Sequence, residues 1–434
     1  MKPNQERFLI KGLKGKKTLK GKITVGGAKN AALKLFAAAL LPKGEVIFEN
    51  VPDIEDIRRM AELIVELGGE VERLAPNTYR IDGREIKNGA INPELAKRFR
   101  ASVVLIGPLL ARFGKVELPQ PGGDVLGKSR PIDFFINAFG RMGAKVIEKD
   151  DGYIFSAPKK LKGAKIFFPF QTVTGTEAAL MAATLAEGTT TIKNAAMEPE
   201  IADLANFLNL CGASVSGAGT PTIIVEGKKK LTPPLKPYRI MPDRLEAGSF
   251  LILGALAADE LEIAGCVPEH IESLFELLSR SGVKFTVKKD SIIIKNNGAT
   301  PNSKFKAVNI RTHEYPGFPT DLQAPMTVFL SQVSGESSVQ ETIFDGRLNY
   351  TEDLVRMGAD IKVWNPHRVA VVGPSTLHGR ELESPDIRAG LAYLWAAIIA
   401  EGESIINNVH HIDRGYERIE KRLRNIGVRI DRVR

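Results

Sequence analysis

Apolar residues along the chain recur in a fixed order of predicted elements. Each repeat contains a short polar loop, a helix that is apolar on nearly every side, a Gly-containing turn, a strand, a second helix, and then Gly and a strand. A helix that is apolar all round is typical of a buried position. The second helix is amphipathic, as shown by the helical spacing of Ile57, Met60, Leu63, Ile64 and Leu67. Copies of this pattern begin near Gly26, Arg98, Thr172, Met241, Phe318 and Ser384.

The repeat predicts the domain organisation. Six units of roughly 65–80 residues, each βαβαββ-like, give two similar α/β domains of three units. A chain of 434 residues also exceeds what one hydrophobic core normally serves. The Pro-rich segment Thr232–Pro242 lies between the third and fourth units and is the expected crossover. A solenoid scaffold for binding is the alternative, but these units are long for a solenoid and their loops carry different charged residues.

Charge and composition argue against several classes of protein function. The net charge is +9, yet long Lys/Arg clusters interleaved with aromatics are missing, so we expect no nucleic-acid partner. Single arginines instead stand beside Asp and Pro at loop-to-helix junctions, which favours small, multiply charged anionic ligands. The apolar stretches are too short to span a bilayer, and the start of the chain lacks a signal peptide. Cys211 and Cys266 are far apart, which favours a reducing cytoplasm, and neither cysteines nor histidines predict a metal site.

The charged loops together resemble the UDP-N-acetylglucosamine 1-carboxyvinyltransferases, the MurA-type enolpyruvyl transferases of peptidoglycan synthesis. The matching stretches occur in the family's order from about Phe8 to Arg434. They are Gly26–Ala32, Arg100–Ser102, Pro121–Gly123 with Arg130–Asp133, Glu198–Glu200, Pro242–Arg244, Phe318–Asp321, Asp386–Arg388 and His411–Arg418. The related EPSP synthases would carry a Gly-Ser-Lys-Ser type loop where this chain has Gly-Ala-Lys-Asn, which favours a sugar nucleotide over shikimate phosphate.

The resemblance implies a fold and two substrates. The fold is an inside-out α/β barrel in each of two domains. The first domain would cover residues 30–240, with a mobile catalytic loop at about 119–130, and the second would cover residues 1–29 and 241–434. The substrates would be phosphoenolpyruvate and UDP-N-acetylglucosamine. No cofactor, metal, membrane or nucleic acid is implied, and we expect a cytoplasmic monomer.

Phosphoenolpyruvate carries close to three negative charges, so its site requires several cations. Bidentate arginine–oxyanion pairs contribute about 1.5–3 kcal/mol each. The positions that match the family's phosphoenolpyruvate-site cations are Lys29, Arg130, Arg347, Arg388 and Arg414. In the family, the sugar 3-hydroxyl adds to C2 of phosphoenolpyruvate while C3 gains a proton, and phosphate then leaves as C3 loses one. These cations would stabilise the carboxylate and the departing phosphate.

Asp321 matches the family's general base for the sugar hydroxyl. Desolvation would raise the pKa of this carboxylate and nearby arginines would lower it, and the sequence leaves both outcomes open. The alternative role is that of a helix N-cap, because Pro-Thr-Asp precedes an apolar helix. The remaining positions implied to bind substrate are Asn30, Arg100, Pro131, Ile132, Asp133, Phe134, Thr172, Val173, Thr174, Ile343 and Asp386.

Asp124 is a departure from most of the family. The loop after Pro-Gly-Gly usually presents a cysteine, whereas this chain has Asp124 and one residue more than the usual spacing before Arg130. A carboxylic acid can deliver the C3 proton as a thiol can, so the implied role is general acid and product-release gate. A turn residue is the alternative. Fosfomycin alkylates the family's cysteine, and the resemblance therefore implies that this chain is insensitive to the drug.

Two other functions stay open. A catalytically silent paralogue that binds UDP-sugars should have lost one of its charged loop residues, and Lys29, Asp124, Arg130, Asp321, Arg388 and Arg414 are all present. An EPSP-synthase-like transferase would instead use shikimate phosphate as the acceptor.

Overall fold

The computed structural model describes residues 6–97, 100–120, 122, 132–296 and 304–434. These residues form two compact units, each with its own hydrophobic core. Unit 1 contains the described residues up to Gly26 and from Pro242 to Arg434, and unit 2 contains the described residues between them. The first boundary thus differs from the one expected after residue 29. Lys29 belongs to unit 2 because it opens the first helix of that unit, and the preceding N–H of Ala28 donates to Met241 O.

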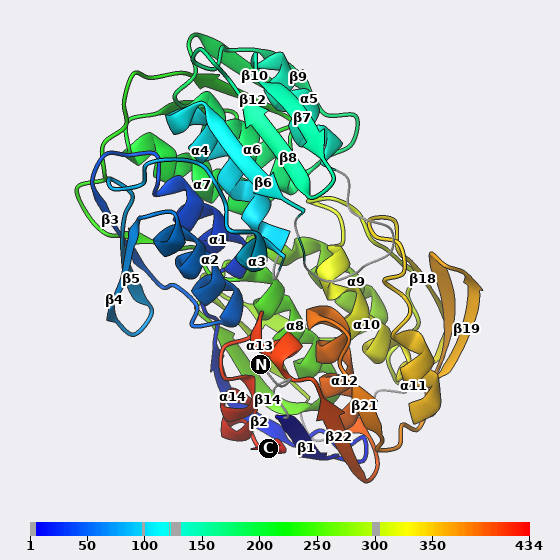
Figure 1. Cartoon of the computed structure of the whole chain (residues 1–434). Helices are drawn as coiled ribbons and strands as arrows, with labels where there is room; N and C mark the ends of the chain where they lie inside the picture. The colour runs from blue at the N-terminus through cyan, green and yellow to red at the C-terminus, as the bar shows by residue number, and fades with distance from the viewer. Residues whose placement is uncertain (1–5, 98–99, 121, 123–131, 297–303) are drawn as a thin grey trace. The chain divides into compact units, whose positions relative to one another are not determined.

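Unit 2 is built from three modules, each with one buried helix and one sheet (Figure 1). The first contains β13 (Tyr238–Arg239), α1 (Lys29–Ala38), β3 (Glu45–Glu49), α2 (Glu55–Glu66), β4 (Glu70–Ala75) and β5 (Thr78–Asp82). The second contains α3 (Pro93–Ala96), η1 (Arg100–Leu105), α4 (Ile106–Phe113), β6 (Lys115–Pro119), α5 (Asp133–Arg141), β7 (Lys145–Lys149) and β8 (Gly152–Ser156). The third contains β9 (Lys165–Phe167), α6 (Val173–Ala183), β10 (Thr189–Lys193), α7 (Pro199–Leu210), β11 (Ser214–Ser216) and β12 (Thr222–Glu226).

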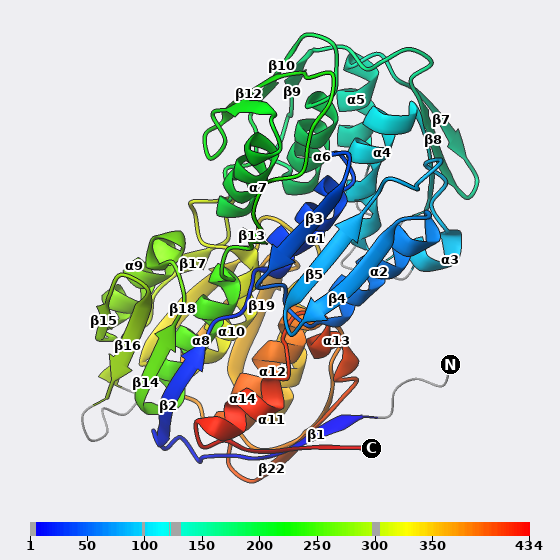
Figure 2. The same ribbon diagram turned by 90° about the vertical axis from the view of Figure 1, so that its left-hand side faces the viewer.

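Unit 1 repeats the same plan (Figure 2). The fourth module contains β2 (Leu19–Thr24), α8 (Arg244–Ala257), β14 (Ala258–Ala264), η2 (Pro268–Ile271), α9 (Glu272–Ser281), β15 (Phe285–Val287) and β16 (Ser291–Lys295). The fifth contains β17 (Ile310–Arg311), η4 (Thr320–Leu322), α10 (Gln323–Leu330), β18 (Gly335–Gln340), α11 (Thr351–Met357), β19 (Asp360–Asn365) and β20 (Arg368–Gly373). The sixth contains β21 (Glu381–Glu383), α12 (Ile387–Ile399), β22 (Glu403–Asn407), α13 (His410–Asp413), α14 (Ile419–Asn425), β23 (Arg429–Val433) and β1 (Arg7–Lys11).

Three strands reach their sheets from distant parts of the chain. In unit 1, β2 pairs parallel with β14, and β1 lies between β22 and β23, antiparallel to both. In unit 2, β13 pairs parallel with β3, so the Pro-rich segment at the end of the unit also supplies a strand. The sheets that contain β1, β2 and β13 combine parallel and antiparallel pairs, as expected of a βαβαββ unit, whereas β6, β8 and β7 of the second module pair only antiparallel.

The buried helices lie inside each unit and the sheets lie outside. Every residue of α8 and of α10 is buried, and α8, α10 and α12 contact one another in unit 1. Strands such as β10 alternate between buried and exposed residues, because one face of each sheet covers the core. This is the inside-out α/β arrangement that was predicted. The second helices are amphipathic as predicted, with Ile57, Met60, Leu63, Ile64 and Leu67 of the α2 segment all buried.

Close helix contact in unit 2 depends on glycine. A Cβ atom added to Gly107 of α4 would lie 2.4 Å from the carbonyl oxygen of Ala178 in α6. Gly107→Ala should therefore lower the free energy of unfolding by about 1–3 kcal/mol, because the backbones must separate. Gly140 of α5 has open space around the same position, so Gly140→Ala should be neutral or should stabilise by up to about 1 kcal/mol. Urea unfolding of both variants tests this, and equal midpoints would contradict it.

Candidate active site

The predicted site residues concentrate where the buried helices begin. In α1, Lys29 and Asn30 precede a run that is buried to the end of the helix, and Val173 and Thr174 do the same in α6. In α12, which is described along its full length, Arg388 is partly exposed and every other residue is buried. Helix N-termini present unpaired N–H groups and a partial positive charge, so these first turns favour anions.

Three predicted residues meet in unit 1. The Asp321 carboxylate lies between Arg347 and Arg388: Oδ1 accepts from Nη2 of Arg347 at 2.7 Å, and Oδ2 accepts from Nη2 of Arg388 at 2.7 Å. The exposed fractions of the side chains are 21% for Asp321, 8% for Arg347 and 12% for Arg388. The alternative role of Asp321 as a helix N-cap is wrong, because η4 has no side-chain cap and this carboxylate is bound by the two arginines.

The electrostatics of this cluster follow from its geometry. Burial alone would raise the pKa of Asp321, but the positive charges of Arg388 and Arg347 outweigh burial and hold the pKa of this carboxyl well below its usual range. Burial would lower the pKa of Arg388, but the charge of Asp321 outweighs it and raises that pKa. Asp321 is therefore ionised at neutral pH and is a weak base while both arginines hold it.

Other predicted residues of unit 1 occupy different positions. The Asp386 side chain caps α12 by accepting from the N–H groups of Arg388 and Ala389 at 2.7 and 2.9 Å. The cap uses only Oδ1, and the expected contact of Asp386 with substrate stays a prediction. The N–H of Ile343 donates to the Glu341 carboxylate at 2.9 Å. Arg414 is 7% exposed and follows α13.

In unit 2, the predicted residues begin separate helices. Lys29 Nζ lies 2.7 Å from Asp56 Oδ2, and the Asp56 side chain is almost completely buried. Arg100 opens η1, and the hydroxyl of Thr172 caps α6 by accepting from the Gly175 N–H at 3.2 Å.

The nucleotide-side residues of this unit begin α5. Ile132 is buried, whereas Asp133 is exposed in the first turn of the helix. The Phe134 ring packs edge-on against Phe168, with a centroid distance of 6.1 Å. Asp124, Arg130 and Pro131 lie outside the described residues.

A buried pair of Lys and Glu side chains in unit 2 was not predicted from the sequence. Lys34 Nζ of α1 lies 3.5 Å from Oε2 of Glu177 in α6, and the Glu177 side chain is fully buried. Burial raises the pKa of Glu177 to about 8; Lys34 acts against this shift and Glu200 adds to it. The available signal was one charged residue inside each otherwise apolar helix, at Lys34 and at Glu177.

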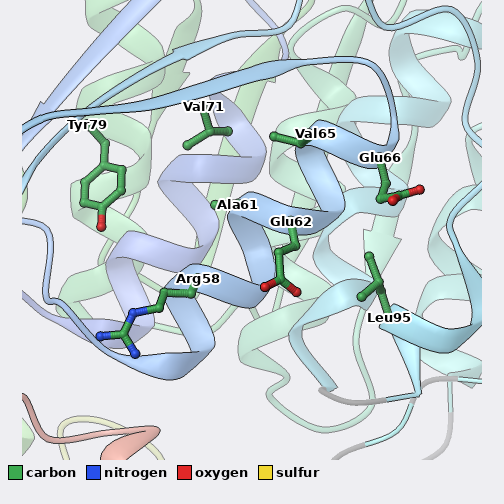
Figure 3. A pocket seen from close by; sticks show the side chains of 8 residues that line it. All are labelled: Arg58, Ala61, Glu62, Val65, Glu66, Val71, Tyr79 and Leu95. Carbon is green, nitrogen blue, oxygen red and sulfur yellow. The ribbon is translucent and has the colours of Figure 1, made fainter.

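A surface hollow of about 460 Å³ lies elsewhere in unit 2 (Figure 3). Its lining residues, all distinct from the predicted site residues, are Arg58, Ala61, Glu62, Val65, Glu66, Val71, Tyr79 and Leu95. Among the residues that the structure describes, no group of three or more His, Cys, Asp or Glu side chains is placed to hold a metal ion. Within the same ranges, no helix combines the length and the apolar character needed to cross a membrane.

Comparison with known proteins places this arrangement in a family. The model of the EPSP synthase (3-phosphoshikimate 1-carboxyvinyltransferase) family matches residues 13–423. The UDP-N-acetylglucosamine 1-carboxyvinyltransferase of Thermodesulfovibrio yellowstonii is 41% identical, with 96% of this chain and 97% of the relative covered. The protein of the same name from Koribacter versatilis is 42% identical, with 99% and 96% covered.

Solved structures agree on the fold. The enolpyruvyl transferase NikO from Streptomyces tendae has a TM-score of 0.88 at 22% identity, with 99% of each chain covered. EPSP synthase from Acinetobacter baumannii has a TM-score of 0.71 at 17% identity, with 99% of this chain and 100% of that chain covered. The chain therefore belongs to the enolpyruvyl transferase family, and within it to the UDP-N-acetylglucosamine 1-carboxyvinyltransferases. It is an enzyme of the transferase class.

The cluster of Asp321, Arg347 and Arg388 should make the stability of the protein depend on pH. Asp321→Asn should lower the free energy of unfolding by about 1.5–3 kcal/mol at pH 7, because two charged hydrogen bonds weaken. The pKa of Asp321 is lower in the folded protein than in the unfolded chain. The ionised carboxylate therefore stabilises the fold fully when the pH is above the pKa of the unfolded chain. This stabilisation is lost as the pH falls through the pKa of the folded protein. The difference in the free energy of unfolding between Asp321→Asn and the parent protein should thus persist down to about pH 4 and become smaller below that pH.

Glu260→Gln is the matched control in unit 1. Glu260 pairs with Lys295 at 2.8 Å, but both side chains are largely exposed, so solvent screens the pair and the variant should change stability little. Denaturant titrations between pH 7 and 3 measure both effects. A loss in Asp321→Asn no larger than in Glu260→Gln would contradict the stabilising role of the cluster.

Proposed function

We propose that this enzyme transfers the enolpyruvyl group of phosphoenolpyruvate to the 3-hydroxyl of UDP-N-acetylglucosamine and releases inorganic phosphate. This is the first committed step of peptidoglycan synthesis. The observation that carries the proposal is the Arg347–Asp321–Arg388 cluster at the start of the buried helices of unit 1, in a chain 41% identical over most of its length to relatives named for this activity. The free thiols of Cys211 and Cys266 support a cytoplasmic location.

The proposed reaction is an addition followed by an elimination. The sugar oxygen bonds to C2 of phosphoenolpyruvate, its proton passes to Asp321, and C3 takes a proton from Asp124. In the second step C3 returns a proton and the bond between C2 and the phosphate oxygen breaks, which restores the double bond. Positive charges stabilise the carboxylate and the leaving phosphate throughout. The cations proposed for this role are Lys29, Arg130, Arg347, Arg388 and Arg414.

The nucleotide half of the acceptor would be bound mainly by unit 2. The N-terminus of α6 can attract its diphosphate, because the first turn of a helix carries a partial positive charge. The residues proposed to bind the nucleotide and the sugar are Asn30, Arg100, Arg130, Pro131, Ile132, Asp133, Phe134, Thr172, Val173, Thr174 and Ile343. Asp386, whose Oδ1 caps α12, completes the set of residues proposed to bind substrate.

Asp321 can act as a base only after the arginines release it. Each arginine uses Nη2 for Asp321, and these are donors that an anionic oxygen of phosphoenolpyruvate would also seek. A substrate that takes over both Nη2 groups removes the contacts that depress the pKa of Asp321 and brings negative charge close to it. The pKa then rises, and the carboxylate becomes a competent acceptor for the sugar proton.

A phosphate-release assay tests the function directly. Phosphate should appear when phosphoenolpyruvate and UDP-N-acetylglucosamine are both present, and it should not appear when either is omitted. Release that requires shikimate 3-phosphate instead would identify an EPSP-synthase-like transferase. Binding of the UDP-sugar without release from any acceptor would identify a catalytically silent paralogue.

The dual role of Asp321 predicts opposite effects on binding and on turnover. Asp321→Asn should reduce kcat by about 100-fold or more, because the proton acceptor is lost. It should also tighten the binding of inorganic phosphate by about tenfold, because the competing carboxylate no longer occupies the arginines. Steady-state kinetics and calorimetric titration with phosphate measure the two effects. Weaker phosphate binding in Asp321→Asn would contradict the proposed competition.

Asp124 predicts insensitivity to fosfomycin. A carboxylate is a much weaker nucleophile than a thiolate towards the epoxide of the drug, so preincubation should leave turnover unchanged over time. Asp124→Cys should introduce time-dependent inactivation. Mass spectrometry checks the outcome, and a covalent adduct on Asp124 of the parent protein would overturn the prediction.

A further inference from the structure

Each arginine of the unit 1 cluster has one nitrogen held by the protein and one shared with Asp321. Arg347 donates from Nη1 to Thr320 Oγ1 at 2.8 Å and from Nη2 to Asp321. Arg388 donates from Nη1 to Tyr416 Oη at 2.9 Å and from Nη2 to Asp321. The Nη1 contacts can persist when an anion displaces Asp321, so they can fix where each Nη2 points.

The hydrogen bond between Arg347 and Thr320 has a fixed direction. Thr320 Oγ1 lies 2.8 Å from Oε2 of Glu341, a carboxylate that is 1% exposed. A guanidinium can only donate, so Thr320 accepts from Arg347, and the single proton of its hydroxyl is donated to Glu341. Oε1 of Glu341 accepts from the hydroxyl of Thr312 and from the N–H of Ile343. Glu341 is thus anchored from several sides, and Thr320 is oriented by it.

A second chain of hydrogen bonds orients Arg388. The Tyr416 hydroxyl, which accepts from Arg388, lies 3.4 Å from Ser249 Oγ, and Ser249 Oγ lies 2.7 Å from the carbonyl oxygen of Leu245. That carbonyl can only accept, so Ser249 gives it its proton and can only accept from Tyr416. The protons of this chain therefore all point away from Arg388. Tyr416 and Ser249 are both buried, so water does not compete with these contacts.

We propose that Thr320 and Tyr416 are positioning residues, which aim the Nη2 groups of Arg347 and Arg388 at the anionic oxygens of phosphoenolpyruvate. Glu341 and Ser249 fix the hydroxyl protons so that both hydroxyls face the arginines as acceptors. The proposal rests on the function proposed above and adds four residues to it. In this proposal each of the four acts through an arginine and not by direct contact with substrate. An arginine without its Nη1 partner can rotate away, and the anion site then loses its preorganised geometry.

Tyr416→Phe and Thr320→Val test the two chains separately. Each removes one hydroxyl at nearly constant shape, so each should raise the KM for phosphoenolpyruvate by about tenfold. The KM for UDP-N-acetylglucosamine should change by less than about twofold, since the arginines serve the other substrate. Thr320→Ser keeps the hydroxyl and should restore most of the affinity that Thr320→Val loses. Glu341→Gln, which presents a donor to Thr320 in place of an acceptor, should shift the same KM in the same direction.

Tyr393→Phe is the matched control. Tyr393 lies in α12, as Arg388 does, and its buried hydroxyl donates to Asp353 Oδ2 at 2.5 Å, so the variant removes a comparable hydrogen bond elsewhere in unit 1. It should leave the KM for phosphoenolpyruvate unchanged. The proposal would be overturned by an unchanged KM in Tyr416→Phe, by equal shifts for both substrates, or by an equal shift in Tyr393→Phe.

Titration with inorganic phosphate separates this proposal from the proposed function. Phosphate should bind Tyr416→Phe about tenfold more weakly than it binds the parent protein or Tyr393→Phe. If the parent protein shows no turnover with the two substrates, the proposed function fails, and the phosphate titration still decides whether the hydroxyls orient the arginines. If turnover is present and phosphate binding is the same in all variants, the positioning role fails by itself.

Discussion

Two guanidinium groups can lie close together in a largely buried region only when an anion lies between them. In unit 1 that anion is Asp321, which shares its two oxygens between Arg347 and Arg388. The charges are stable there because each partner has further hydrogen bonds and because the first turns of buried helices favour negative charge. In the proposed reaction, a more highly charged ligand replaces the carboxylate without leaving the cations uncompensated.

Much of the fold could be predicted because its signals are local. Runs such as the α8 segment are apolar on every side, and the structure buries every residue of that helix. The sources of β1, β2 and β13 could not be predicted in this way. These strands pair with partners far along the chain, and pairing of that kind leaves no periodicity within a short window. The resemblance supplied the fold, but it did not specify these pairings.

Only part of the candidate site could be predicted from the sequence. Charged residues at the starts of apolar helices indicate function, and Asp321, Arg347 and Arg388 do meet. Asp386 shares that position but caps its helix, because a side chain just before a first turn can serve either role. The roles of Thr320 and Tyr416 were not predicted, because what a hydroxyl does depends on its hydrogen-bond partners, and these are brought to it only by the tertiary structure. The Lys34–Glu177 pair depends likewise on two helices meeting.

The position of β1 and β2 at the N-terminus affects the order in which the two units can fold during synthesis. Unit 2 lies between the two parts of unit 1 in the sequence, so its three modules are complete once the chain has been synthesised through Met241. The segments β1 and β2 emerge first, yet their partners β22, β23 and β14 are made much later. These early segments must wait with unpaired edges while the intervening unit folds, and closure of the last sheet requires the final residues of the chain. A truncated product would therefore retain a complete unit 2 together with an open, association-prone remainder.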